Sequence, residues 1–202
     1  MPSALHTRSQ ATRAAMLEAA RDEFSAFGFR RTSMEGIARR AEVSRATLYL
    51  HWRGKQDLFR ALVEVLHEEH LAAMEAVLEE PGLSLRERTL AMLEARYVRF
   101  VEMTSASPYA AELYDLHGRL CGDVTRASQE RSERLLARML RDASARGEAD
   151  LGRCGLSASR VAGVLLDCAH GAKGEDPAVA TPDEFRERLA RSVRVLMTGI
   201  AA

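Results

Sequence analysis

The sequence is poor in the residues that β-rich, secreted and membrane proteins need. Of its 202 residues, 5% are aromatic and five are proline, which disfavours a β-sandwich or a β-barrel. Cys121, Cys154 and Cys168 are odd in number and widely spaced, which argues against a disulfide framework or a structural zinc site. No apolar run reaches the length of a membrane span, and no signal-peptide core is present. We therefore expect a cytoplasmic protein in a reducing compartment.

The formal net charge is zero, but the charged residues are unevenly distributed along the chain. Residues 1–55 contain ten Arg or Lys against five Asp or Glu, whereas the remainder contains 19 against 24. Such asymmetry between parts of a chain indicates that the N-terminal part faces an anionic partner. Hydrophobic residues make up 47% of the sequence, which is enough to form a folded core.

The spacing of apolar residues predicts helices throughout the N-terminal part. Residues 1–10 are expected to be a loose arm, and the amphipathic helix that follows is expected to stop at Gly28. Thr32 is expected to be the N-cap of the next helix, with Glu35 completing a capping box. Two further helices are predicted over about 45–51 and 55–80.

The rest of the chain has the same helical spacing, interrupted by a clear break at Pro81-Gly82. Helices are expected after Ser84, from Ser107 to about Gly118, and then over about 122–146, 157–172 and 182–199. Thr181, Pro182 and Glu184 give the last of these a strong start signal. No strand pattern competes, so the sequence predicts an all-α protein with about nine helices.

The helices over about 33–52 have the spacing of a helix-turn-helix, with the break at 41–43. In that motif the second helix enters the major groove of DNA. Lys55, at the start of the following helix, is expected to hold a phosphate. The second helix carries side chains suited to base edges and phosphates: Arg45, Ala46, Thr47, Tyr49 and His51.

The same region contains the runs 32–38 (TSMEGIA), 41–44 (AEVS) and 47–52 (TLYLHW), with 24–29 (FSAFGF) upstream. Over about residues 10–70 these runs resemble the TetR/AcrR family of bacterial transcription regulators. The resemblance implies a homodimeric repressor whose N-terminal domain, residues 10–70, binds a palindromic operator. It also implies a C-terminal domain, residues 71–202, that dimerises and binds a small-molecule inducer.

The resemblance further implies roles for individual residues. Thr32 and Ser33 would hold a phosphate at the start of the first helix of the motif. Bases would be read by Arg45, Ala46 and Thr47, and the DNA backbone would be bound by Tyr49, His51 and Lys55. The chain departs from the family at Glu42, where glycine is usual, and at Trp52, where phenylalanine is usual.

The C-terminal domain offers two weaker sets of candidates. Aromatic, methionine and histidine side chains lie where the family usually lines its ligand pocket: Tyr97, Phe100, Met103, Tyr109, Tyr114, His117 and His170. Apolar stripes on the last two helices predict a four-helix dimer interface, with part of each stripe packed on the chain's own core. The candidate interface residues are Ala162, Leu166, Ala169, Leu189, Val193 and Leu196.

Alternative functions are a transcriptional activator or corepressor-dependent regulator of the same fold, and a helical interaction module that binds no DNA. The charge asymmetry argues against the interaction module. A Gly-rich phosphate loop and the GxSxG and HExxH motifs are absent, so we expect neither an enzyme nor a cofactor. His67 and His70 lie three residues apart, but a metal site needs three or four ligands, and we expect no metal.

Overall fold

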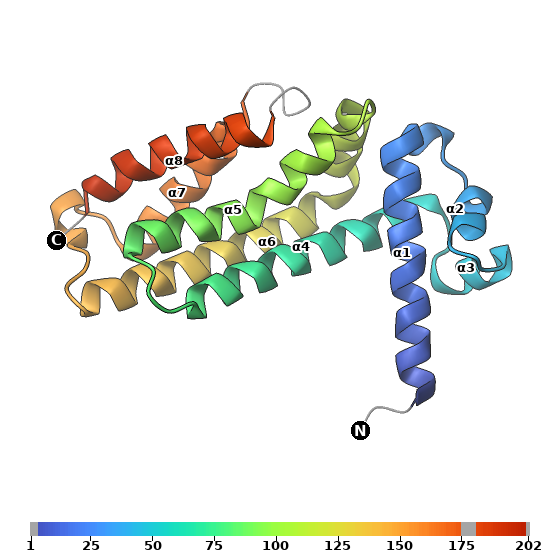
Figure 1. The fold of residues 1–202 in the computed structure, drawn as a ribbon, viewed down its shortest axis with the longest axis horizontal. Helices are drawn as coiled ribbons and strands as arrows, with labels where there is room; N and C mark the ends of the chain where they lie inside the picture. The colour runs from blue at the N-terminus through green and yellow to red at the C-terminus, as the bar shows by residue number, and fades with distance from the viewer. Residues whose placement is uncertain (1–3, 175–180, 201–202) are drawn as a thin grey trace. The chain divides into compact units, whose positions relative to one another are not determined.

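The computed structural model describes residues 4–174 and 181–200, which form eight α-helices and one short 3₁₀ helix (Figure 1). No strand occurs in these two ranges, and the predicted all-α fold is confirmed. None of the described helices is long and apolar enough to cross a membrane.

The chain divides into two compact units. The first contains residues 1–66 and 106–122, and the second contains residues 67–105 and 123–202. The first unit therefore takes in a segment, 106–122, that the sequence analysis assigned to the C-terminal domain. Helices α4 (Lys55–Glu79) and α6 (Ala110–Ala145) each contribute residues to both units.

The first unit begins with α1 (Ala4–Arg31), so most of the expected loose arm is helical. Gly28 kinks this helix, with φ of 73°, rather than ending it. A Cβ atom at Gly28 would lie 2.7 Å from Oε2 of Glu112, which approaches from the start of α6. Oε1 of the same carboxylate accepts a hydrogen bond from the backbone N–H of Arg30 at 2.8 Å. The close approach of Glu112 and the positive φ both require a glycine at this position.

Helices α2 (Met34–Arg40) and α3 (Arg45–His51) follow, as the helical spacing predicts. The N-cap of α2 is Ser33, not Thr32, because the Ser33 side chain accepts from the Gly36 N–H. Between the two helices Glu42 has φ of 54°, a conformation that glycine adopts without strain. The family's usual glycine at this position therefore has a conformational reason.

The second unit is formed by parts of α4 and α6 together with α5 (Leu85–Ser105), α7 (Ala158–Ala172) and α8 (Pro182–Thr198). A short 3₁₀ helix, Leu151–Cys154, lies in the loop before α7. The helices predicted to be separate over 107–118 and 122–146 form the single helix α6. It is kinked at Cys121, where φ is −126° and ψ is 16°.

The core of the second unit corrects the predicted dimer interface. The apolar stripes of α7 and α8 pack inward with α5 and α6 in one cluster of buried side chains. Leu196 is partly buried against that cluster, and the other five residues are at most 2% exposed: Ala162, Leu166, Ala169, Leu189 and Val193. These five buried side chains belong to the core of their own chain and cannot provide the contact surface of a dimer, whereas the place of Leu196 in an interface stays a prediction.

Candidate nucleic-acid interface

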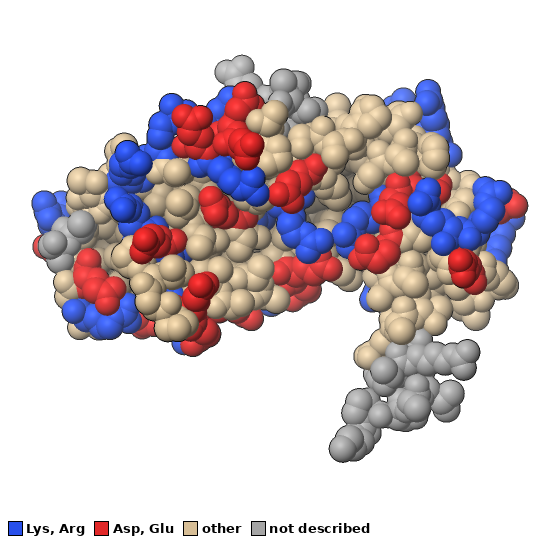
Figure 2. All heavy atoms as spheres, viewed as in Figure 1, with Lys and Arg blue, Asp and Glu red and all other residues tan. Residues whose placement is uncertain are grey.

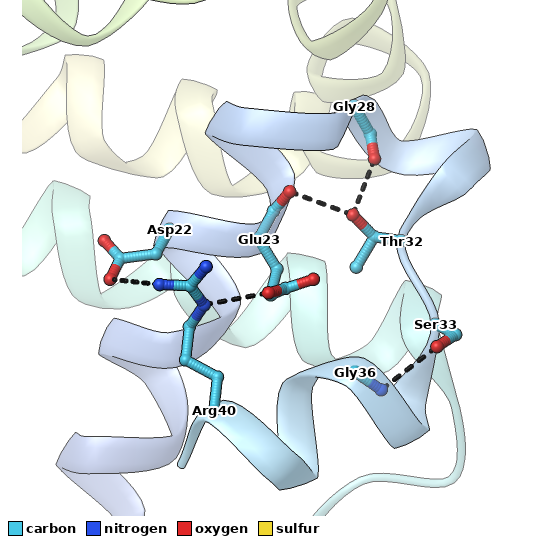
Figure 3. A network of polar contacts seen from close by, with 7 residues as sticks. All are labelled: Asp22, Glu23, Gly28, Thr32, Ser33, Gly36 and Arg40. Carbon is cyan, nitrogen blue, oxygen red and sulfur yellow. Dashed lines mark hydrogen bonds and ion pairs between the residues drawn. The ribbon is translucent and has the colours of Figure 1, made fainter.

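Helix α2 is fixed to α1 by a small polar network (Figure 3). Arg40 on α2 donates from Nε to Oε1 of Glu23 at 2.8 Å, and its Nη1 lies 3.5 Å from Oδ2 of Asp22. At the other end of α2, Thr32 donates from Oγ1 to the carbonyl oxygens of Glu23 and Gly28. These contacts orient the helix that precedes α3.

Helix α3 is held by one buried face and one side-chain cap. Leu48 is fully buried, and Trp52, which follows the helix, is 6% exposed. Ser44 is the N-cap, and its Oγ accepts from the Thr47 N–H at 3.0 Å. The hydroxyls of Ser44 and Thr47 also share a hydrogen bond of 2.8 Å. The opposite face of α3 therefore stays in solvent.

The exposed face of α3 carries the side chains best placed to reach DNA: Arg45, Ala46, Tyr49, Leu50 and His51. The Arg45 guanidinium carbon lies 5.4 Å from the centre of the Tyr49 ring, one turn further along the helix. This stacking presents the guanidinium at the start of α3, where a helix-turn-helix contacts base edges.

Leu50 is a surface residue that the sequence analysis did not assign to the site. Its side chain is 85% exposed, although a leucine usually faces a core. The position could have been recognised, because Leu48 and Trp52 define the buried face of this short helix and Leu50 falls outside it. An apolar side chain there suits contact with a thymine methyl group.

The remaining predicted DNA-binding residues have different environments. Ser33 is exposed at the start of α2, and Thr47 is half-buried beside Ser44. Thr32 is 3% exposed, and its hydroxyl is already bonded to two carbonyl oxygens. The Thr32 side chain is therefore a buried structural contact rather than a phosphate ligand.

Lys55 also differs from its predicted role. Its Nζ donates to the carbonyl oxygens of Phe29 at 2.5 Å and Thr32 at 2.8 Å, and lies 4.4 Å from the centre of the Phe29 ring. Burial lowers the pKa of this ammonium group below its ordinary value. The Lys55 side chain therefore links the end of α1 to the start of α4, and it is not available to a phosphate.

The seven candidate pocket residues do not all line one pocket of the second unit, because some of them belong to the first unit. Tyr109 belongs to the first unit, where its hydroxyl accepts from Nη1 of Arg31 at 2.9 Å. Tyr97 is buried on α5, Phe100 and Met103 are half-buried, and His170 is exposed on α7. Tyr114 and His117 lie on the first part of α6. Sequence position alone could not show this division.

His70 lies on α4 in the second unit and is 7% exposed. Burial, reinforced by the nearby charges of Arg96 and Arg99, lowers its pKa to about 4. In the described ranges, no three His, Cys, Asp or Glu side chains gather as metal ligands would.

The region that contains the helix-turn-helix matches the model of a known protein family. The profile described as "Bacterial regulatory proteins, tetR family" matches residues 16–62, which run from α1 into α4. Residues 16–62 therefore carry a DNA-binding motif of the TetR type. The sequence resemblance to TetR/AcrR regulators is thus confirmed.

Curated relatives match this chain over its N-terminal part. The HTH-type transcriptional regulator TtgR of Pseudomonas putida is 42% identical over 62 residues, 31% of this chain and 30% of that protein. The regulator UidR of Escherichia coli is 36% identical over 75 residues, 37% of this chain and 38% of that protein. The chain thus spans about a third of the length of these curated relatives.

Solved structures match this chain over nearly its full length. A TetR-like transcriptional regulator from Rhodococcus sp. RHA1 has a TM-score of 0.59 and 27% identity, covering 98% of this chain and 99% of that one. SmeT, the repressor of the Stenotrophomonas maltophilia efflux pump SmeDEF, has a TM-score of 0.65 and 20% identity, covering 96% and 92%. The SmeT match supports the fold only.

Proposed function

We propose that this protein is a ligand-responsive transcriptional repressor of the TetR family. It binds a palindromic operator as a dimer and is released by a small-molecule inducer. The observation that carries the proposal is the solvent-exposed face of α3, held by buried Leu48 and Trp52 within a helix-turn-helix. The relatives TtgR and UidR are named as HTH-type transcriptional regulators, which supports the same function.

The proposed DNA contacts follow from exposure and chemistry. Arg45, at the start of α3, has the fork of donors that suits O6 and N7 of guanine. Ala46 and Leu50 are exposed apolar groups that suit thymine methyl groups. Ser33, Tyr49 and His51 carry exposed hydrogen-bonding groups, and these would position the protein on the phosphate backbone.

A dimer is proposed because one helix-turn-helix provides few of the contacts that operator affinity requires. The outer faces of α7 and α8 are the part of the second unit proposed for the interface. They expose Val164 at 39% and Val195 at 73%. Gly163 has open space around its Cβ position, which allows close approach of a second helix. Along α8, Figure 2 shows acidic and basic side chains interspersed, a pattern that suits a self-complementary contact.

The experiment that tests the proposal is a mobility-shift and footprinting assay on the DNA upstream of the protein's own gene. Protection of two half-sites one helical turn apart is expected for a dimeric helix-turn-helix protein. A reporter fused to that DNA should be expressed less when the protein is present. Increased expression would indicate an activator instead, and failure to bind any DNA from a random pool would overturn the proposal.

A further inference from the structure

Two buried cations of the second unit lie over the same aromatic ring. The guanidinium carbon of Arg96 on α5 lies 5.2 Å from the centre of the Tyr97 ring, and Nζ of Lys173 lies 5.4 Å from it. Nζ of Lys173 is also 5.2 Å from the centre of the Phe100 ring. The two residues are 4% and 5% exposed. Burial of two like charges side by side is unfavourable unless something compensates for them.

The described part of the chain does not supply a compensating negative charge. Arg96 donates to two neutral acceptors, Oγ of Ser128 at 3.0 Å and Oε1 of Gln129 at 3.1 Å. Its Nε is buried without a partner. In residues 4–174 and 181–200, no carboxylate forms an ion pair with Arg96 or Lys173. The negative charge of the exposed Asp167 on α7 helps to raise the pKa of Tyr97, but Asp167 forms no ion pair with either cation.

His70 adds a second buried nitrogen without a hydrogen-bond partner. Its Nε2 is buried without a partner, and the positive charge of Arg96 acts on the ring. Burial, reinforced by repulsion from Arg96, also lowers the pKa of the Lys173 ammonium group. Within residues 4–174 and 181–200, the cluster of Arg96, Lys173, His70 and the Tyr97 ring therefore has an excess of positive charge and two buried nitrogens without a hydrogen-bond partner. A bound anion would satisfy both.

From this cluster we infer that the ligand of the second unit is an organic anion, bound by Arg96 and Lys173 and packed against the rings of Tyr97 and Phe100. Half-buried Phe100 and exposed His170 place one edge of the cluster at the surface. The inference rests on the proposed ligand response, because it names the chemical class of that ligand. The rings and the neighbouring buried side chains Val101 and Ala169 would contact its apolar part.

A purely structural explanation of Lys173 makes a different prediction. Lys173 is the C-cap of α7, where a cation interacts favourably with the helix dipole. If that interaction and the two rings fully compensate the charge, Lys173→Met should lower the melting temperature of the free protein. If an anion is required, Lys173→Met should leave the melting temperature unchanged or raise it, because it removes an uncompensated buried charge.

Binding is measured on the full chain without DNA, so that its failure is distinguishable from failure of the DNA-binding proposal. The probes are benzoate, 1-naphthoate and decanoate, each compared with its neutral amide by calorimetry at constant ionic strength. At least one acid should bind about tenfold or more tightly than its amide, because only the acid pairs with the two cations.

Two variants assign the effect to the cluster. Lys173→Met should abolish the preference for the acid over the amide. Arg99→Met is the matched control, because Arg99 lies on the same helix but is exposed and already paired with Glu69 at 3.3 Å. It should keep the preference. The inference is overturned if none of the acids binds, if acid and amide bind equally, if Lys173→Met binds the acid as wild type does, or if Lys173→Met lowers the melting temperature.

Discussion

The two lysines of the chain, Lys55 and Lys173, both place their ammonium groups over aromatic rings inside the fold. The exposed positive charge of the helix-turn-helix therefore comes from arginine. Arg40 is occupied by Asp22 and Glu23, whereas Arg45 has no carboxylate partner among the described residues. At the scale of single residues, the functional assignment depends on what each cation already contacts.

Lys55→Met should destabilise the first unit without changing how DNA binding depends on salt. Carbonyl oxygens of Phe29 and Thr32 would lose their donor, which costs about 1–3 kcal/mol of the free energy of unfolding. Urea unfolding measures that loss. A phosphate contact would instead appear as a log–log salt slope reduced by about 1, and that result would restore Lys55 to the interface.

His70 should make the protein sensitive to acid. The unfolded chain takes up a proton at this histidine near its ordinary pKa of about 6.5, whereas the folded chain does so at about 4. Between these two pKa values the unfolded chain binds the proton and the folded chain does not. The free energy of unfolding therefore falls by up to about 3 kcal/mol as the pH drops from about 6.5 to about 4. His70→Gln should show a correspondingly smaller loss in unfolding experiments between pH 7 and pH 4. Equal losses in the two proteins would show that the folded histidine titrates normally.

At the scale of elements, the kink of α1 at Gly28 packs against Tyr109 and Glu112, at the start of α6. This contact fixes the end of α1, which leads into the helix-turn-helix. Gly28→Ala places a methyl group 2.7 Å from Glu112 and 2.9 Å from the Tyr109 ring, at a φ of 73°. We expect a loss of about 2 kcal/mol or more in the free energy of unfolding.

Gly118→Ala is the matched control for this substitution. Gly118 lies within α6 and has open space around its Cβ position, so the added methyl group should stabilise the helix by up to about 1 kcal/mol. Thermal unfolding of the two variants separates the predictions. Equal effects at both positions would mean that Gly28 is not required by the kink.

Much of the helical pattern could be predicted from local sequence. Thr181 caps α8 as expected, because the side chain of Thr181, the proline that follows it and Glu184 together form a helix start signal. Local sequence does not show which of the adjacent hydroxyls, Thr32 or Ser33, is the N-cap of α2. The choice depends on the hydrogen bond of Thr32 to α1, which leaves Ser33 to cap α2. The apolar stripes of α7 and α8 could not be divided between core and dimer contact from sequence, because both use the same apolar residues. Tertiary packing alone distinguishes them.

At the scale of the whole molecule, the proposed dimer links two helix-turn-helix motifs to one operator. Val195→Glu should weaken this dimer, because it puts a charge on the proposed contact face at a side chain that is 73% exposed. Its exposure means that the fold of the single chain should not change. Sedimentation should show monomers, and operator affinity should fall by about a hundredfold through loss of the second half-site.

Ala72→Glu is the control for the dimer test, because it adds the same charge at an exposed position on α4. It should remain dimeric with unchanged operator affinity. A Val195→Glu protein that still sediments as a dimer would exclude this face as the interface.

We propose that the exposed face of α3 reads DNA bases, and binding by Arg45→Ala is the decisive measurement. Fluorescence anisotropy at fixed salt would compare binding to the selected operator and to random DNA. The control is Arg134→Ala, which removes an exposed arginine from α6 in the second unit. We expect Arg45→Ala to cost about 1–3 kcal/mol on the operator and little on random DNA, with Arg134→Ala unchanged on both. Equal losses of Arg45→Ala on both DNAs, or no loss on either, would contradict the claim.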